Sequence, residues 1–376
     1  MEDDAHMPIP AAPHHRSLLA ATATLAVAAL AACSSGGADA SPPSATASAS
    51  VSATASPSQA PGTVTLVTHD SFLLSDGILD DFTAQTGITV KVVQQGDAGA
   101  LVNQLVLTKD APLGDATFGI DNTFASRAVD EGVVAPYESA APAAADSATH
   151  PGGPGLTAID YGDVCINVDH AWFTKHHLAE PVTLDDLTDA KYKNLLVVPN
   201  AVTSSPGFAF LLATIGAKGD DWQAYWEALK KNGLKVAEGW SDAYYTDFSG
   251  GGADGPRPIV LSYASSPPET IPKGGGDATT GALLDTCFRQ TEYAGVLTGA
   301  KNPEGAKKLI DFLLSDEVQA DIPGSMYMYP VSTAVQIPED WQKFAPLAPA
   351  PFDVAPGDIT ANREAWLAQW SQTVVG

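Results

Sequence analysis

The sequence predicts an α/β protein, because runs rich in β-branched residues alternate along the chain with segments of helical periodicity. Its 376 residues are 45% hydrophobic, which is enough apolar material for a large core or for two lobes. The formal net charge of −25 argues against a nucleic-acid binder, since no basic stripe is present to neutralise phosphates. The same acidity disfavours adhesion to anionic lipid and suits a protein that meets cationic or neutral small molecules.

The first 32 residues are interpreted as an export signal. Residues 17–32 form an alanine-rich apolar run that is too short for a permanent membrane span, and Cys33 follows it directly. The junction at 30–33 resembles the bacterial lipobox, in which the signal is cut before a cysteine that is then lipidated. Cys33 is therefore the expected lipid attachment point. The alternative is an ordinary secretory signal in which Cys33 is incidental.

Residues 33–62 are expected to form a flexible stalk. They consist almost wholly of Ala, Ser, Thr, Pro and Gly and contain no aromatic residue. Such a segment cannot bury enough apolar surface to offset the entropy lost on ordering. It would hold the globular part away from the membrane. The sequence thus predicts an exported protein that is anchored to the outer face of the cell membrane as a lipoprotein.

The predicted globular part begins with three strands and two helices. The β-branched run 64–68 predicts the first strand, and 78–86 has helical spacing with Gly87 as a stop signal. By the same patterns, a strand is predicted at 88–93, a helix at 100–107 and a strand at 116–120.

The pattern continues through the second half of the chain. Strands are predicted at 158–161 and 195–198, helices are predicted at 207–215, 222–231 and 303–314, and 259–263 and 292–297 are further apolar runs. Pro303 suits the first turn of its helix. Strands that alternate with helices imply a largely parallel sheet, and in such sheets ligands bind at the carboxyl ends of the strands.

Polar and aromatic residues occupy the loops at these strand ends. Ser204 and Ser205 precede a helix whose N-terminus could seat a phosphate, although most such serines only cap their own helix. Trp240 and Tyr263 could stack on a flat ring or face a cation, or they could be ordinary core aromatics. The combination of carboxylates, aromatic residues and a helix start in these loops indicates a binding cleft.

Six motifs carry a family resemblance. They are THDSF (68–72), GIDN (119–122), TSSPGFAFLL (203–212), EGWSDAY (238–244), LSYASSP (261–267) and MYPV (328–331). In order and spacing the chain from 64 to 376 resembles the thiamine-binding proteins of bacterial ABC importers. The resemblance implies a type II periplasmic-binding-protein fold, in which two α/β lobes joined by hinge strands close over thiamine or its phosphates. Lobe 1 would comprise 63–163 and, after the chain returns, 288–376 with a C-terminal helical segment; lobe 2 would comprise 164–287.

The resemblance also implies a ligand set. Asp97 and Ala98 match the family's acidic contact and its neighbour, and the pair Ser204–Ser205 matches the residues beside the phosphate or hydroxyethyl end of the ligand. Trp240 matches the family's Gly-Trp-Ser tryptophan, and 263–267 match its ligand loop. The expected ligand-binding residues are Asp70, Ser71, Asp97, Ala98, Asp121, Ser204, Ser205, Trp240, Tyr263, Ala264, Ser265, Ser266, Pro267 and Tyr327.

The chain departs from the family pattern at several contacts. His69 stands where tyrosine is expected, Tyr327 replaces a tryptophan, and no tryptophan follows Phe72. Glu269 occupies the position of a ligand-stacking tyrosine. If Glu269 faces the cleft, its carboxylate would repel phosphate and favour unphosphorylated thiamine.

Two cysteines remain in the globular part. Cys165 and Cys287 fall about where the resemblance places the two crossings between the lobes. Neighbouring hinge strands would bring the sulfurs into bonding range, and export favours oxidation. We therefore predict a Cys165–Cys287 disulfide.

Two alternative functions stay open. A ferric-ion binder of the same superfamily could use the adjacent Tyr244 and Tyr245. A thiamine-degrading transferase could use Cys165 or Cys287 as nucleophile with Glu269, although an oxidised pair would be inert. We expect a monomeric binding protein without catalytic residues, cofactor or metal. Its partners would be thiamine, thiamine monophosphate or diphosphate, and the permease subunits, with no nucleic acid.

Overall fold

The computed structural model describes residues 62–139, 151–252 and 254–376. The expected signal peptide, the lipidation at Cys33 and the stalk up to residue 61 lie outside these residues. The described part is mixed α/β, as the sequence predicts. None of the helices in this part is long and apolar enough to cross a membrane.

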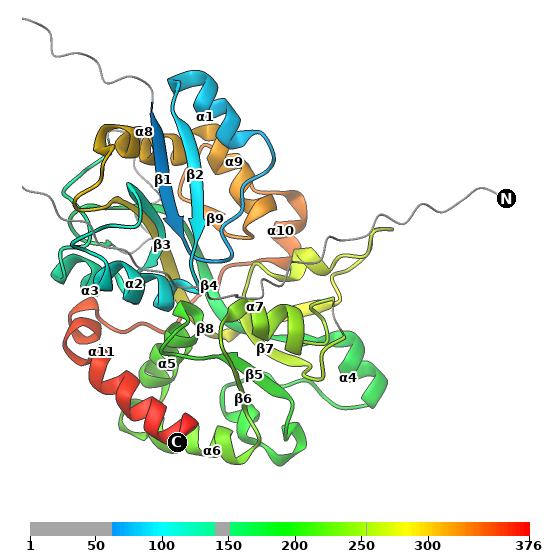
Figure 1. The fold of residues 1–376 in the computed structure, drawn as a ribbon. Helices are drawn as coiled ribbons and strands as arrows, with labels where there is room; N and C mark the ends of the chain where they lie inside the picture. The colour runs from blue at the N-terminus through cyan, green and yellow to red at the C-terminus, as the bar shows by residue number, and fades with distance from the viewer. Residues whose placement is uncertain (1–61, 140–150, 253) are drawn as a thin grey trace, which may run out of the picture. The chain divides into compact units, whose positions relative to one another are not determined.

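The described strands form one nine-stranded sheet (Figure 1). Its order is β2-β1-β3-β8-β4-β7-β5-β6, and β9 pairs with β4 beside this path. The strands are β1 (Thr63–Thr68), β2 (Thr89–Gln94), β3 (Ala116–Asp121), β4 (Leu156–Asp169), β5 (Leu196–Pro199), β6 (Lys235–Ala237), β7 (Ile259–Tyr263), β8 (Thr280–Val296) and β9 (Tyr329–Pro330).

The sheet is mixed, and the expectation of a largely parallel sheet is wrong. Strand β1 pairs in parallel with β2 and β3, and β5 pairs in parallel with β6 and β7. In contrast, β4 and β8 are 14 and 17 residues long and run antiparallel to each other through the middle of the sheet. The chain leaves one half of the sheet on β4 and returns on β8, so two neighbouring crossings must run in opposite directions.

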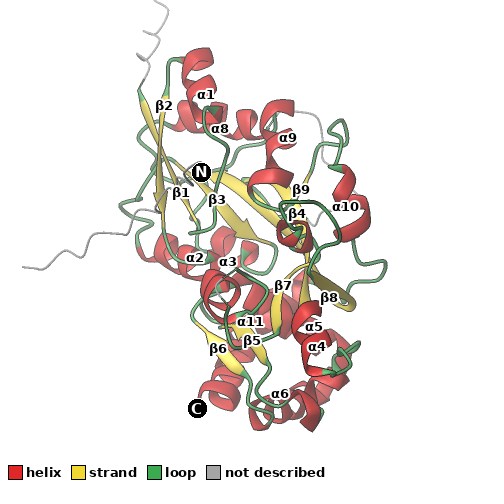
Figure 2. Ribbon diagram, turned by 90° about the vertical axis from the view of Figure 1, so that its right-hand side faces the viewer, coloured by secondary structure: helices red, strands yellow, loops and turns green. Residues whose placement is uncertain are grey.

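The long central pair divides the fold into two parts. Lobe 1 is the part built around β1–β3 and lobe 2 the part around β5–β7 (Figure 2). The described helices are α1 (Ile78–Thr86), α2 (Ala98–Leu107), α3 (Ala125–Asp130), α4 (His170–His176), α5 (Ser205–Lys218), α6 (Trp222–Lys231), α7 (Trp240–Asp242), α8 (Pro303–Leu313), α9 (Asp316–Ser325), α10 (Glu339–Phe344) and α11 (Pro356–Trp370). In both views α1, α8 and α9 gather with lobe 1, whereas α4, α5 and α6 gather with lobe 2.

Aromatic contacts hold helices to each lobe. In lobe 1, Phe82 of α1 packs on Phe312 of α8 with ring centroids 5.2 Å apart. In lobe 2, Trp226 of α6 meets the ring of Trp370 edge to face at 5.5 Å. Trp370 ends α11, so the C-terminal helix packs against lobe 2, and its Arg363 also donates a hydrogen bond to Ser126 of α3.

Helix starts follow the expected capping chemistry. Ser204 caps α5 by accepting a hydrogen bond from the Gly207 backbone N–H, and Pro206 lies in the first turn. Asn302 caps α8 in the same way, ahead of Pro303. The α1 helix ends at Gly87, whose φ of 70° is the left-handed conformation that glycine adopts without strain.

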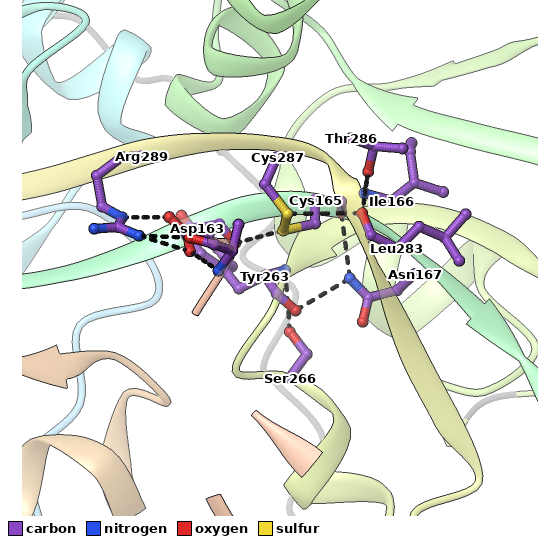
Figure 3. Close-up of a disulfide and its surroundings, with 11 residues drawn as sticks. Asp163, Cys165, Ile166, Asn167, Tyr263, Ser266, Leu283, Thr286, Cys287 and Arg289 are labelled. Atoms are coloured by element: carbon purple, nitrogen blue, oxygen red, sulfur yellow. Dashed lines mark hydrogen bonds and ion pairs between the residues drawn. A yellow bond between two sulfur atoms is a disulfide. The ribbon is translucent and has the colours of Figure 1, made fainter. Parts of the chain in front are cut away.

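The predicted Cys165–Cys287 disulfide is present and joins β4 to β8 (Figure 3). The pairing of these strands shifts in register between Val164 and Ile166, because β8 has extra residues on its side of the ladder. Thr286 in this bulge accepts a hydrogen bond from the Ile166 backbone N–H at 3.0 Å. The disulfide therefore closes an irregular point of the two strands that connect the lobes.

Candidate functional site

A cavity of about 440 Å³ opens at the strand ends of the two lobes. Lobe 1 contributes the segment after β1 and the start of α2, and lobe 2 contributes the starts of α5 and α7 and the segment after β7. Its described lining residues are His69, Asp70, Ser71, Phe72, Leu73, Gln94, Asp97, Ala98, Ser205, Pro206, Trp240, Ser241, Tyr245, Tyr263, Ser266, Glu269, Glu292, Gly324, Ser325, Met326, Tyr327 and Met328. The cavity thus lies where ligands bind in open α/β sheets.

Asp97 joins the two lobes across the cavity. It is the N-cap of α2, where its Oδ1 accepts a hydrogen bond of 2.6 Å from the Ala98 N–H. The same oxygen accepts from the Ser205 N–H at 3.1 Å, and Oδ2 accepts from the Trp240 N–H at 2.9 Å. Burial raises the pKa of Asp97, and the N–H groups of Trp240 and Ser205 act in the opposite direction.

The close approach of the lobes here requires a glycine. A β-carbon built on Gly99, in the first turn of α2, would lie 2.8 Å from both the carbonyl carbon and the oxygen of Thr203. The Ala100 N–H donates to that same Thr203 oxygen at 2.9 Å. The start of α2 therefore packs directly on the backbone that precedes α5.

A chain of hydrogen bonds connects the lining residues Ser205 and Tyr263. Ser205 Oγ donates to Asp121 Oδ2 at 2.6 Å and accepts from Gln290 Nε2 at 2.9 Å. Gln290 in turn accepts from the Tyr263 hydroxyl at 3.0 Å. Burial raises the pKa of Asp121 to about 7, because desolvation and repulsion by Glu292 outweigh the hydrogen bonds that it accepts.

Two further lining residues, His69 and Glu292, face each other. His69 Nδ1 accepts a hydrogen bond from the Ser71 N–H at 3.1 Å, while Nε2 lies 3.5 Å from Glu292 Oε1. Burial opposes a charge on His69, but the combined attraction of Glu292, Asp97 and Asp70 outweighs it, so the pKa of His69 is raised. On the sheet Glu292 is also the register partner of Asp160, whose carboxylate is fully buried and whose pKa is raised by that burial and by Glu292.

Aromatic side chains of lobe 2 form one wall of the cavity. Trp240 stacks on Tyr244 at 5.1 Å and meets Tyr263 edge to face at 6.2 Å. Its indole Nε1 donates to Ser262 Oγ at 3.0 Å, which fixes the plane of the ring. Tyr245 is partly exposed in the cavity, and its hydroxyl donates to Glu269 Oε1 at 3.2 Å.

Tyr327 lines the cavity from the segment between α9 and β9. Its φ of 55° is left-handed, and its ring stacks with Trp341 at 6.4 Å. Ser265 Oγ donates to the Tyr327 carbonyl at 2.5 Å, so the loop after β7 holds this segment in place.

The expected ligand residues divide into two groups. The cavity lining includes Asp70, Ser71, Asp97, Ala98, Ser205, Trp240, Tyr263, Ser266 and Tyr327. Five others are not among the lining residues, namely Asp121, Ser204, Ala264, Ser265 and Pro267. Ser204 is used as the cap of α5 and Asp121 lies beneath Ser205, whereas the other three are buried in the loop after β7.

Some lining residues were not expected from the sequence. In the sequence Glu292 only begins an apolar run, and its place in the cavity depends on the antiparallel pairing of β8. Gln94 ends β2, where the strand-end rule could have singled it out. Glu269, expected in the cleft only conditionally, does line the cavity, and burial raises the pKa of its carboxyl.

The structure also shows where the residues considered for the two alternative functions lie. Within the described part of the chain, no group of three or more His, Cys, Asp or Glu side chains is arranged to hold a metal ion. Tyr244, one of the two tyrosines considered for ferric ion, is buried. Cys165 and Cys287, the two thiols considered for catalysis, are joined to each other and are not among the cavity-lining residues.

Comparison with known proteins adds independent findings. Residues 77–349 match the sequence family described as bacterial extracellular solute-binding protein. The thiamine-binding periplasmic protein of Escherichia coli strain K12 is 29% identical over 328 residues, which cover 85% of this chain and 95% of that protein. A solved structure of a periplasmic thiamin binding protein superposes with a TM-score of 0.73 at 27% identity and covers 84% of this chain and 98% of that one. Iron-bound HitA from Pseudomonas aeruginosa gives a TM-score of 0.65 at 21% identity, covering 83% and 99%, which shows a shared fold only.

Proposed function

Because the chain belongs to the bacterial extracellular solute-binding proteins, we propose that it captures thiamine and delivers it to the permease of an ABC importer. The observation that carries the proposal is the composition of the cavity. Aromatic rings line it together with the carboxyl groups of Asp70, Asp97, Glu269 and Glu292. Relatives named for thiamine binding match the chain over most of its length.

The cavity suits the chemistry of thiamine. The thiazolium ring carries a permanent positive charge, which aromatic faces and nearby carboxylates attract. The aminopyrimidine is a flat ring that can stack and form hydrogen bonds. Trp240 and Tyr263 offer ring surface, and Ser71, Ser205 and Ser266 offer hydroxyl groups. We assign ligand contact to these residues and to Asp97, Ala98, Asp70 and Tyr327.

Capture would proceed by closure of the two lobes rather than by a reaction. Asp97 of lobe 1 bonds the backbone N–H groups of Ser205 and Trp240 in lobe 2, so these contacts form only when the lobes approach. The hinge would lie where β4 and β8 lose register, next to Cys165 and Cys287. This supports lobe boundaries near 163/164 and 287/288 for the two crossings, whereas the C-terminal helix α11 within 288–376 packs against lobe 2.

We further propose where the protein acts and with which partners. It acts as a monomeric binding protein without catalysis or cofactor, since its relatives are binding proteins and its candidate nucleophiles are oxidised. Cys33 carries the lipid that anchors it at the outer face of the membrane. The partners are the permease subunits, which would recognise the closed lobes.

Calorimetric titration of the full chain with thiamine tests the proposal. We expect saturable binding of one thiamine per chain, at roughly micromolar affinity or tighter. Ferric ion serves as the competing ligand, because Tyr245 and Glu269 are the nearest the described cavity comes to an iron site. If ferric ion saturates the protein and thiamine gives no heat, the iron alternative replaces this proposal.

A further inference from the structure

We infer that the cavity selects unphosphorylated thiamine and discriminates against thiamine monophosphate and diphosphate. The reason is that the Asp97 carboxylate already binds the backbone N–H groups, at the starts of two helices, that a phosphate group would otherwise bind. This inference rests on the proposed function, since it concerns the ligand of the same cavity. It is carried by three observations, which are the charge of the lining, the occupied N–H groups at the start of α5 and the pairing of His69 and Arg289 with carboxylates.

The lining charge is strongly one-sided. Four of the described lining residues are acidic, namely Asp70, Asp97, Glu269 and Glu292. None of the described lining residues is a lysine or an arginine, and His69 is the one basic side chain among them. A phosphate group that enters such a cavity loses water and meets carboxylates without a cationic partner, whereas a thiazolium cation gains from the same charges.

The start of α5, which could replace a cation, is already used. Asp97 Oδ1 accepts hydrogen bonds from the Ala98 N–H at the start of α2 and from the Ser205 N–H at the start of α5. In the first turn of α5, Pro206 has no N–H, and the Gly207 N–H donates to Ser204 Oγ. The next N–H of this turn, that of Phe208, donates to the Ser204 carbonyl. The first-turn donors that would bind a phosphate at α5 are therefore all occupied.

His69 and Arg289 are paired with carboxylates as well. His69 uses Nδ1 as an acceptor for the Ser71 N–H and directs Nε2 toward Glu292. Any charge that His69 gains is thus matched by the Glu292 carboxylate. Arg289 of β8 bonds the Asp163 carboxylate through both Nε and Nη2 near the disulfide (Figure 3). Neither cation is available to a phosphate group.

The test is a set of calorimetric titrations of the full chain with thiamine, thiamine monophosphate and thiamine diphosphate. We expect wild type to bind thiamine about tenfold or more tightly than either phosphate ester. A factor of this size corresponds to the repulsion between two unit charges about 10 Å apart in a partly desolvated site. Glu269→Gln keeps the acceptor for the Tyr245 hydroxyl and removes a charge, and Asp97→Asn removes the charge at the helix starts. Each variant should lower the preference for thiamine several-fold. Glu227→Gln, an exposed change on α6 outside the cavity, should leave it unaltered.

The possible results separate this inference from the proposed function. If wild type binds thiamine but binds the monophosphate equally or more tightly, the selectivity inference is overturned and the proposed function stands. If neither thiamine nor its phosphates bind, both are overturned. Suppose that wild type is selective and that both Glu269→Gln and Asp97→Asn fold and bind thiamine. If these variants then keep the wild-type preference for thiamine over its phosphates, the assignment of the selectivity to these two carboxylates is wrong. Should Asp97→Asn not fold, Glu269→Gln alone decides between these outcomes.

Discussion

The Ser205 hydroxyl lies 2.6 Å from the Asp121 carboxylate and links the start of α5 in lobe 2 to the end of β3 in lobe 1. Thr123 Oγ1 and the N–H groups of Thr123 and Phe124 also donate to this carboxylate. The group has 0% exposure, so desolvation still dominates. The contact between the lobes therefore includes a carboxyl group whose charge is costly when the protein is folded.

Stability should fall as pH rises through the titration of Asp121. Its pKa is raised from 3.8 to about 7 in the folded protein, so the folded state binds this proton more tightly than the unfolded chain. The stabilisation that the protonated Asp121 contributes is complete below pH 3.8 and is lost as pH rises through about 7. Between pH 5 and pH 8 the loss from this group is about 3 kcal/mol.

Chemical denaturation of wild type and Asp121→Asn at pH 5 and pH 8 checks this. The neutral asparagine keeps an acceptor for the Thr123 and Phe124 N–H groups but cannot ionise. The variant should therefore gain stability relative to wild type at the higher pH. An equal difference between wild type and Asp121→Asn at both pH values would contradict the expectation.

Loss of the Cys165–Cys287 disulfide should destabilise the protein. The bond joins residues 122 positions apart, so it removes much conformational freedom from the unfolded chain. Replacing both cysteines with serine should lower the free energy of unfolding by about 2–5 kcal/mol. Reduced wild type should lose a similar amount, and the reductant should have no effect on the double variant. A midpoint of denaturation that does not move in either case would show that the cross-link adds no stability.

Local signals explain which elements were predictable. The α1 helix has the expected bounds 78–86 because Phe82 supplies its buried face and Gly87 its left-handed cap. The lengths of β4 and β8 were underestimated because buried polar residues interrupt their apolar pattern. Asn167 and Gln290 are fully buried in these strands, and their amides donate hydrogen bonds to other parts of the fold, which no local pattern reveals.

The cavity was predictable in outline but not residue by residue. Two adjacent serines at the start of α5 have the same sequence signal, yet Ser204 turns back to cap the helix and Ser205 lines the cavity. The position of Glu292 follows from the antiparallel register of β8 with β3, in which it pairs with Asp121. Contacts of this kind depend on segments that are distant in sequence, so the chain's local pattern does not encode them.

Gly99→Ala should weaken ligand binding by opposing closure. The added methyl group would lie 2.8 Å from the Thr203 backbone, so α2 and the segment before α5 must move apart. That movement lengthens the Asp97–Ser205 contact across the cavity. We expect thiamine affinity to fall about tenfold, which corresponds to about 1.4 kcal/mol. Gly274→Ala is the control, because a β-carbon there meets nothing within 4 Å. Equal affinities of the two variants would contradict the expectation.

Trp240 should contribute to affinity through its ring face and through its orientation. Tyr244 stacks on one face of the indole at 5.1 Å, and Trp240 lies in the cavity lining. A cation over an aromatic ring in a desolvated site contributes roughly 2 kcal/mol, so Trp240→Ala should weaken thiamine binding about 30-fold.

Trp240→Phe separates these two contributions. Phenylalanine keeps a ring face but lacks the indole N–H that bonds Ser262 Oγ at 3.0 Å. Trp240→Phe should therefore lose less thiamine affinity than Trp240→Ala. Titration of the three proteins with thiamine, followed by calorimetry, measures the order. Trp172→Phe is the matched control, because Trp172 stacks on His176 of α4 and is not among the cavity-lining residues. Identical affinities for wild type and Trp240→Ala would show that the ligand does not contact this wall, and the assignment of Trp240 would have to be withdrawn.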